Sequence, residues 1–344
     1  MGKFVVDTVY VEEEVLEHPR AKTIISKFPL ARIIEIDRFG EVFNKRNQNF
    51  KIQKMNPAII LAKKYKKLIL PAPDGFGIGG KRNYYFSHMY NCIYDCRYCF
   101  LQGMYSSANY VIFINFEDFA EQITQINKEF SKESITFFSG YDCDSLALEN
   151  ITGFLDYILP IFSPYPKSML EIRTKSARLK PMTIVSPPDN CIIAYSLMPE
   201  IMSRVLDHKA PSIERRIKSM TDLANRGWKI GLRFDPLIYG KNWKELYTEL
   251  IESISKNIPS EAIHSISFGP LRFPRAMFQK IFKLYPDDIL FTGPITQRGS
   301  IMAYGEEIEN EMALHCRQLF SNFVSDSIIF QCVSEGSSNL SDQV

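Results

Sequence analysis

The sequence has no run of about eighteen apolar, uncharged residues, so it offers no helix that would cross a bilayer. Its first twenty residues turn acidic where an export signal needs an apolar core. Val6 also stands where a myristoylation site needs Ser or Thr. Internal repeats are lacking as well. These absences lead us to expect a cytoplasmic protein with no membrane partner.

A large excess of one charge is also lacking, since the formal net charge is only +2. The charge is unevenly distributed, however, because the segment from Lys45 to Lys67 holds eight basic residues and no acidic one. Such a segment could contact phosphate groups of a nucleic acid, or it could be the solvated face of a helix. The sequence leaves both interpretations open.

Six short runs rich in apolar, β-branched and aromatic residues predict strands. They cover residues 84–90, 134–139, 168–174, 190–197, 228–234 and 263–268. Amphipathic stretches that predict helices lie between most of them, at 116–130, 146–159, 211–227 and 242–257. Strands that alternate with helices indicate parallel pairing through right-handed crossovers.

We therefore predict an α/β fold, a partial (β/α)6 barrel with parallel strands, over residues 84–275. Residues 1–83, which include the basic segment, are expected to form an N-terminal extension. Residues 276–344 are expected to form a small C-terminal region. In open or closed sheets of this kind the chemistry gathers at the carboxyl ends of the strands. The residues that follow each strand are therefore the candidates for function.

Cysteine is the residue whose placement is most informative. The chain has seven cysteines, an odd number without an export signal, which favours reduced thiols over disulfides. Cys92, Cys96 and Cys99 are spaced CxxxCxxC directly after the first predicted strand. Thiolates at this spacing favour an iron–sulfur cluster with one iron left open, or else a zinc ion for which His88 would be the nearest fourth ligand.

This motif, on the loop after the first strand of a βα-repeat chain, resembles that of the radical S-adenosylmethionine superfamily. The segment Cys92–Gln102, CIYDCRYCFLQ, further resembles the spore photoproduct lyase family, whose motif is CxxxCxYCYLQ. The resemblance implies a [4Fe-4S] cluster on the three cysteines, with S-adenosylmethionine chelated by the free iron. One electron from an external reductant would then give a 5′-deoxyadenosyl radical.

The resemblance also implies cofactor contacts at four successive strand ends. Gly140 and Asp142 stand where the family has a methionine-binding turn. Lys175 matches a lysine expected on the cofactor carboxylate, and Ser196 matches a serine expected near the ribose. Asp235 falls where the lyase makes a backbone contact to adenine.

The family splits a methyl-bridged thymine dimer, so the implied partner is DNA that contains a damaged pyrimidine dinucleotide. Cys143 is the candidate hydrogen donor and Tyr98 the candidate relay tyrosine. The pattern departs from the family at two points, because Phe100 replaces a second tyrosine and Tyr141 occupies the aligned place of the donor cysteine. A radical enzyme acting on RNA, a peptide or a small molecule is therefore one alternative, and a non-enzymatic zinc-binding module is another.

Overall fold

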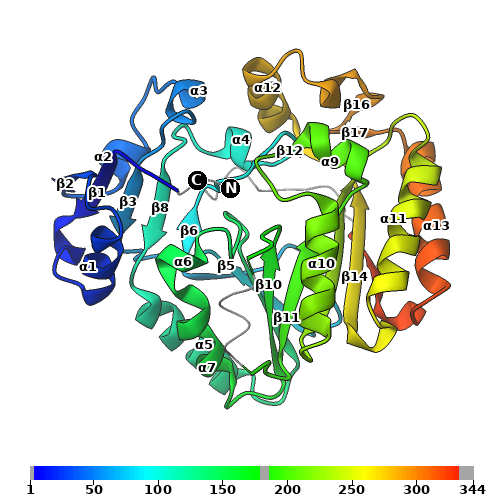
Figure 1. The fold of residues 1–344 in the computed structure, drawn as a ribbon, viewed down its shortest axis with the longest axis horizontal. Helices are drawn as coiled ribbons and strands as arrows, with labels where there is room; N and C mark the ends of the chain where they lie inside the picture. The colour runs from blue at the N-terminus through cyan, green and yellow to red at the C-terminus, as the bar shows by residue number, and fades with distance from the viewer. Residues whose placement is uncertain (1–3, 179–185, 333–344) are drawn as a thin grey trace.

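The structure is a computed structural model that describes residues 4–178 and 186–332. Its largest feature is a curved eight-stranded sheet (Figure 1). The strands follow one another across this sheet in the order β18 (Ile329–Gln331), β14 (Ile263–Pro270), β13 (Lys229–Leu237), β11 (Cys191–Ser196), β10 (Ser168–Thr174), β9 (Ile135–Ser139), β5 (Arg82–Phe86) and β4 (Ile69–Pro71).

The six strands predicted from sequence are β5, β9, β10, β11, β13 and β14. Each pairs in parallel with the next, without interruption, which confirms the partial barrel. The strand predicted at 168–174 coincides with β10. Its residues Leu170 and Ile172 are completely buried. Both faces of such a sheet are covered, so near-continuous apolar runs are what its strands require.

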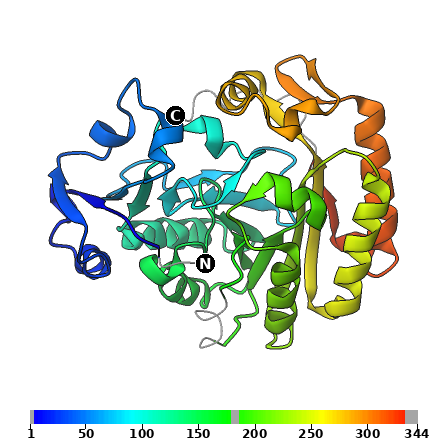
Figure 2. The same ribbon diagram turned by 45° about the horizontal axis from the view of Figure 1, so that its top comes forward.

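Helices cover the outer face of the sheet (Figure 2). The principal ones are α5 (Phe116–Glu129), α7 (Phe154–Phe162), α10 (Ile213–Ala224), α11 (Trp243–Asn257) and α13 (Glu306–Ser321). In α11, Trp243, Leu250 and Ile254 recur at helical spacing and are buried, while Leu246 is only partly buried.

Two predicted elements are each divided in the structure. The run at 84–90 contains β5 and the separate strand β6 (Met89–Tyr90), which joins a different sheet. The helix predicted at 146–159 is interrupted at Gly153, whose φ of +60° ends α6 (Glu149–Thr152) before α7 begins. Both predictions treated a continuous apolar run as one element. The apolar pattern continues across each break, which is a change in backbone conformation.

Residues predicted as an extension form most of a second, five-stranded sheet. Its order is β2 (Arg32–Ile36), β1 (Thr8–Glu12), β3 (Ile59–Ala62), β8 (Tyr110–Phe113) and β6. Short helices accompany it: α1 (Pro19–Ser26), α2 (Gly40–Phe43) and α3 (Phe50–Gln53). Because β6 and β8 follow residue 83, this sheet draws strands from both sides of the predicted boundary. The division into three parts stays a prediction.

The basic segment does not form one solvated helix face. Within it, α3 is four residues long and β3 is completely buried. Lys64 is only 8% exposed, and Lys54 forms an ion pair with Asp95. Part of the segment therefore points into the protein.

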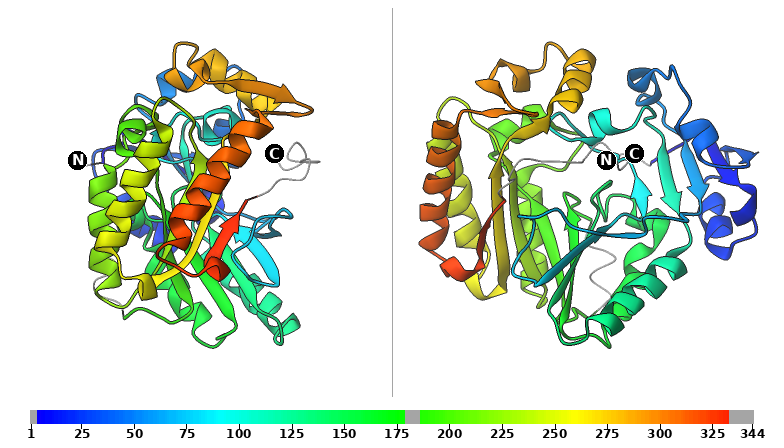
Figure 3. Two further views of the ribbon diagram at one scale, coloured as in Figure 1. Left: turned by 90° about the vertical axis from the view of Figure 1, so that its right-hand side faces the viewer. Right: turned by 180° about the vertical axis from the view of Figure 1, so that it is seen from behind.

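Beyond β14, the chain forms α12 (Arg275–Leu284) and a three-stranded sheet of β15 (Arg272–Pro274), β17 (Ile301–Tyr304) and β16 (Ile295–Arg298). The five-stranded sheet and α13 lie at opposite sides of the molecule (Figure 3). Residues 333–344 of the predicted C-terminal region lie outside the described residues. No helix in the described ranges has the length and apolar character needed to cross a membrane.

Candidate active site

The three clustered cysteines lie on a loop between β6 and α4 (Leu101–Met104), where Figure 1 shows α4 beside β12 (Asp207–His208). Asn91 opens this loop with a φ of +66°. Its side-chain amide donates to the carbonyl oxygens of Ser107 at 2.8 Å and Asn109 at 2.7 Å. An asparagine tolerates this left-handed backbone conformation better than most residues, so the turn into the loop is fixed locally.

The middle of the loop is held by neighbouring elements. Cys96 lies in β7 (Asp95–Cys96), which pairs antiparallel with β12. The Gln102 amide donates to the Cys96 carbonyl oxygen at 3.0 Å. Lys54, from the basic segment, donates to the Gln102 side-chain oxygen at 2.7 Å and pairs with Asp95. The loop is thus anchored by residues far away in the sequence.

Two features around the thiols would stabilise anionic sulfur ligands against the effect of burial. The Tyr94 N–H donates to Cys92 Sγ at 3.4 Å. Burial raises the pKa of the Cys92, Cys96 and Cys99 thiols, whereas the positive charge of Lys175 lowers it for Cys96 and Cys99. Thiolate-bound iron–sulfur clusters are stabilised by such hydrogen bonds and charges. The donor set therefore fits a [4Fe-4S] cluster.

The geometry offers less to a single metal ion. Within the described ranges, no group of three or more His, Cys, Asp or Glu side chains is placed to share one ion. A cube-shaped cluster takes each thiolate on a different iron and needs no such convergence. His88, the candidate fourth ligand for zinc, is completely buried, and its ring stacks on Phe154 with 3.8 Å between centroids.

Gly140 begins a tight turn after β9. Its φ is +78°, and its N–H donates to the Phe86 carbonyl oxygen at 3.1 Å. A Cβ at this position would collide with the Ser145 hydroxyl. Only glycine fits here without displacing a neighbour.

Asp144 is a residue of this turn that the sequence prediction missed. Its carboxylate accepts hydrogen bonds from the Thr174 hydroxyl at 2.7 Å and from the Lys175 N–H at 2.6 Å. It also accepts from the Leu146 N–H at 3.0 Å. The turn after β9 is thereby tied to the end of β10. No motif marks Asp144, because Thr174 and Lys175 lie about thirty residues further along the chain.

Lys175 is the predicted cofactor residue that the structure brings next to the cysteines. Burial lowers its pKa, but the negative charges of a Cys96 thiolate and of the Asp207 carboxylate outweigh that effect and raise the pKa above its usual range. Its Nζ lies 5.4 Å from the centre of the Tyr98 ring. The ammonium group is therefore held in its charged form beside the loop.

Ser196 and Asp235 lie on the next two strands of the sheet. The Ser196 carbonyl oxygen accepts from Arg216 at 2.9 Å, and its side chain is partly exposed. The Asp235 carboxylate accepts from the Ser267 hydroxyl at 2.7 Å, while its other oxygen is buried with no hydrogen-bond partner in the described ranges. Ser196 is linked to the cysteine loop only indirectly, since Arg216 also pairs with Asp207, which accepts a hydrogen bond from Tyr98.

Tyr98 and Cys143 have different neighbours. Tyr98 is buried, and its hydroxyl donates to Asp207. Cys143 is 7% exposed, and the charged residues that act on its thiol are chiefly Asp142, Asp144 and Lys64. Burial raises the pKa of the Cys143 thiol, which therefore stays protonated. The structure thus gives the two predicted catalytic residues separate surroundings.

Two aromatic residues mark the departures from the family motif. Phe100 packs against Phe273, and Tyr141 packs against Tyr85 with 4.4 Å between ring centres. Asp142, beside Tyr141, accepts a hydrogen bond from Tyr105 and gives its N–H to the Ser87 hydroxyl at 2.9 Å.

Asp142, Tyr141 and Lys64 line a pocket of about 50 Å³, which has room for a few water molecules. Lys64 lies among aromatic rings, with its Nζ 5.0 Å from the centre of Tyr90 and 5.2 Å from that of Phe113. Burial lowers the pKa of Lys64 to about 8 and raises that of Asp142. Each group is therefore shifted toward its neutral form.

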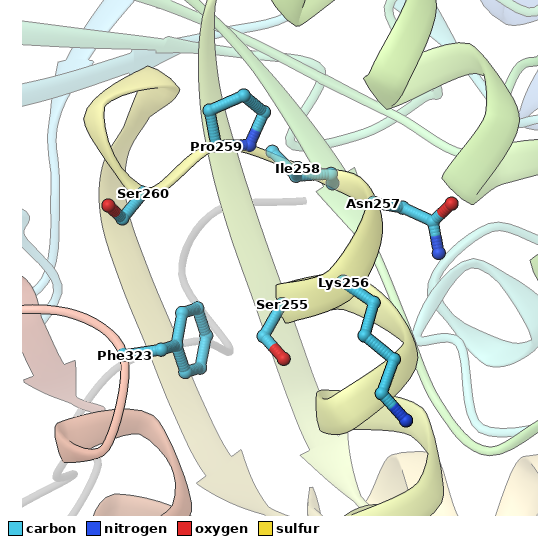
Figure 4. Close-up of a pocket in the computed structure, with 7 residues that line it drawn as sticks. All are labelled: Ser255, Lys256, Asn257, Ile258, Pro259, Ser260 and Phe323. Carbon is cyan, nitrogen blue, oxygen red and sulfur yellow. The ribbon is translucent and has the colours of Figure 1, made fainter.

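A larger pocket, of about 320 Å³, lies between the end of α11 and Phe323 (Figure 4). Lys256 is the one charged side chain among the residues drawn there. The pocket faces Pro259 and Ser260, which precede β14, so it lies away from the carboxyl ends of the strands. We do not assign it a role in the candidate site.

Known proteins resemble this chain over most of its length. The spore photoproduct lyase of Bacillus subtilis (strain 168) is 23% identical over 291 residues, which cover 82% of this chain and 83% of that protein. The spore photoproduct lyase of Clostridium acetobutylicum is 23% identical over 285 residues, covering 81% and 82%. A spore photoproduct lyase variant solved with bound AdoMet and dinucleoside spore photoproduct matches with a TM-score of 0.81 at 18% identity, over 96% of this chain and 99% of that chain.

The family model for spore photoproduct lyase matches residues 4–307. That match spans most of both sheets described above and includes the cysteine loop. The chain belongs to the spore photoproduct lyase family.

Proposed function

We propose that this chain is a radical S-adenosylmethionine lyase that repairs a methyl-bridged thymine dimer in DNA. The observation that carries the proposal is the loop with Cys92, Cys96 and Cys99 beside the charged Lys175, in a chain of this family. The related structure with bound AdoMet and dinucleoside spore photoproduct supports both the cofactor and the class of substrate.

The three cysteines would hold a [4Fe-4S] cluster, which, when bound, supplies the electron that cleaves S-adenosylmethionine to a 5′-deoxyadenosyl radical. An external one-electron donor would reduce the cluster again. Lys175 would pair with the cofactor carboxylate, since a compact ammonium suits that contact. Gly140 would let the backbone approach the cofactor closely, and Asp142, Ser196 and Asp235 would complete its pocket along the strand ends.

Tyr98 and Cys143 would serve the hydrogen transfers. The Cys143 thiol would return a hydrogen to the substrate, and Tyr98, fixed by Asp207, would act as a relay. The damaged dinucleotide would have to be extruded from the stacked DNA in order to reach these residues. Because all seven cysteines are unpaired, the reaction is expected in a reducing compartment, the cytoplasm.

The test is anaerobic reconstitution followed by turnover with a dinucleoside spore photoproduct. Stoichiometric iron and acid-labile sulfide, cleavage of S-adenosylmethionine and conversion of the photoproduct to two thymines are expected. Zinc without labile sulfide would instead indicate a non-enzymatic zinc module. Cofactor cleavage without photoproduct conversion would indicate a radical enzyme that acts on RNA, a peptide or a small molecule.

A further inference from the structure

A fully buried ion pair lies behind the cysteine loop. Arg216, on α10, and Asp207, on β12, have side chains that are 0% and 1% exposed, and Arg216 Nη2 lies 2.7 Å from Asp207 Oδ2. The distance is that of an ion pair, although the two groups are not aligned as a hydrogen bond. Arg216 also donates to the carbonyl oxygens of Pro211 at 3.0 Å and Ser196 at 2.9 Å. The guanidinium is thus fixed on three sides.

Asp207 connects this pair to the cysteine loop. Its Oδ1 accepts the Tyr98 hydroxyl, and its backbone lies opposite Cys96 in the β7–β12 pairing. The Arg97 N–H donates to the Leu206 carbonyl oxygen at 2.9 Å, which extends the same attachment by one residue. The ion pair therefore reaches the segment between two of the three cysteines through both side-chain and backbone contacts.

Several charged side chains act on the cysteines in this region. Lys175 and Asp207 act electrostatically on the Cys96 thiol, and Arg216 also interacts with it. Asp144 is a further carboxylate that interacts with Lys175 and with Cys92, so two cations and two carboxylates surround the cysteines. An anionic iron–sulfur cluster on the thiolates would add negative charge that these cations stabilise.

We propose that Asp207 and Arg216 are positioning residues that fix the cysteine loop and set the reduction potential of its cluster. The inference rests on the proposed function, because it requires a cluster on Cys92, Cys96 and Cys99. A carboxylate near the cluster disfavours the added electron, whereas a guanidinium favours it. The two residues would therefore act in opposite directions on the potential.

The test uses full-length protein reconstituted anaerobically, with iron, sulfide and the midpoint potential of the cluster as readouts. Asp207→Asn keeps an acceptor for Tyr98 but removes the charge, so the potential is expected to become less negative. Arg216→Gln is expected to make it more negative. Arg216→Lys, which retains a positive charge, should restore the potential toward that of the parent protein.

A second buried pair provides a matched control. Arg233 and Glu171 are both 0% exposed, with 2.7 Å between Arg233 Nη2 and Glu171 Oε2, and neither is among the main charges that shift the pKa of the three cysteines. Glu171→Gln should lower stability but leave the iron content and the potential unchanged. If Asp207→Asn loses its cluster while Glu171→Gln keeps it, the positioning role is supported.

Two results would overturn the inference. One is a fully loaded Asp207→Asn protein with the parent potential. The other is equal cluster loss in Asp207→Asn and Glu171→Gln, which would show that the Asp207–Arg216 pair contributes only to folding. Failure of the parent protein itself to assemble a cluster would instead overturn the proposed function, so the two failures are distinguishable.

Discussion

Two neighbourhoods at the carboxyl ends of the barrel strands differ in whether their buried charged groups form ion pairs. Around the cysteine loop, Lys175, Asp207 and Arg216 form a network in which charges of opposite sign compensate one another. Around the segment that follows β9, Lys64 and Glu149 are buried and Asp142 is partly buried, and none of them forms an ion pair in the part of the chain that the structure describes. The groups in the first neighbourhood therefore stay charged, whereas the pKa values in the second are shifted toward the neutral form of each group.

This difference follows the match to the family. The cysteine loop keeps the family motif except at Phe100, whereas the segment after β9 is where the sequence prediction aligns Tyr141 with the donor cysteine. Around Cys143, burial raises the pKa of Asp142 and Asp144 and lowers that of Lys64, so each of these groups is shifted toward its neutral form. Hydrogen-atom transfer needs protonated donors, so this surrounding suits Cys143, while the charged network suits a cluster.

The largest effect is expected from removing a ligand in the charged neighbourhood. Cys96→Ala should abolish cleavage of S-adenosylmethionine, because a cluster on the two remaining cysteines lacks a ligand. The measurement is the yield of 5′-deoxyadenosine from anaerobically reconstituted protein. Cys191→Ala is the control, since Cys191 is a buried thiol in β11 and should leave cleavage in place. Undiminished cleavage by the Cys96 variant would show that the cluster is held elsewhere.

Sequence reasoning found the first neighbourhood more completely than the second. The CxxxCxxC spacing is local, so the three cysteines could be identified from eight consecutive residues. Asp207 and Arg216 lie about one hundred positions after Tyr98 in the sequence. No local sequence pattern marks either residue as part of the site. Lys64 was read only as part of a basic segment, because its burial depends on rings contributed by β6, β8 and α5.

The same distinction applies to the fold. The strands of the barrel are buried apolar runs separated by amphipathic helices, and their periodicity made all six recognisable. The strands β1, β2 and β3 escaped prediction, since β2 is largely exposed and the basic residues around β3 obscured its four apolar residues. Pairing between β3 and β8 is also a long-range contact that no local signal reveals.

A second test addresses the buried ammonium of Lys64. The pKa of about 8 in the folded protein is below the usual value for lysine, so between about pH 8 and pH 10 the unfolded chain binds more protons. The free energy of unfolding of the parent protein should therefore rise with pH across this window. Lys64→Met should remove the rise and stabilise the protein at pH 7 by up to about 3 kcal/mol, measured by denaturant unfolding.

Lys66→Met is the matched control, because Lys66 is exposed two positions further along the chain. This variant should retain the pH-dependent rise and change stability by less than about 0.5 kcal/mol. A flat pH profile in the parent protein would mean that Lys64 has a compensating partner when the protein is in solution.

Glu149 provides a smaller test in the same neighbourhood. Burial raises the pKa of its carboxyl to about 7, although the Leu155 N–H donates to it at 2.8 Å. The folded protein then binds the extra proton between about pH 4 and pH 7, so stability should fall as the pH rises through this window. Glu149→Gln should abolish that fall and be more stable at pH 8 by about 2 kcal/mol, after a weaker hydrogen bond to Leu155 is allowed for. If the variant shows the same fall, the titrating group lies elsewhere.

The smallest effect on cofactor cleavage is expected from Cys143→Ala, which alters the neutral neighbourhood without touching the cluster ligands. Cleavage should stay within about twofold of the parent, and the change should appear in the products of dimer repair. In D2O the thiol hydrogen is exchanged for deuterium, so a product hydrogen donated by Cys143 carries the label.

Mass spectrometry of the repaired thymines separates Cys143 from its neighbour, because the Tyr141 hydroxyl exchanges in D2O as well. If Cys143 is the donor, Cys143→Ala loses the deuterium and Tyr141→Phe retains it. The opposite pattern would assign the donor to the tyrosine that packs on Tyr85. In that case the neutral neighbourhood would serve a phenol rather than a thiol, and the departure from the family motif at Tyr141 would be a functional replacement.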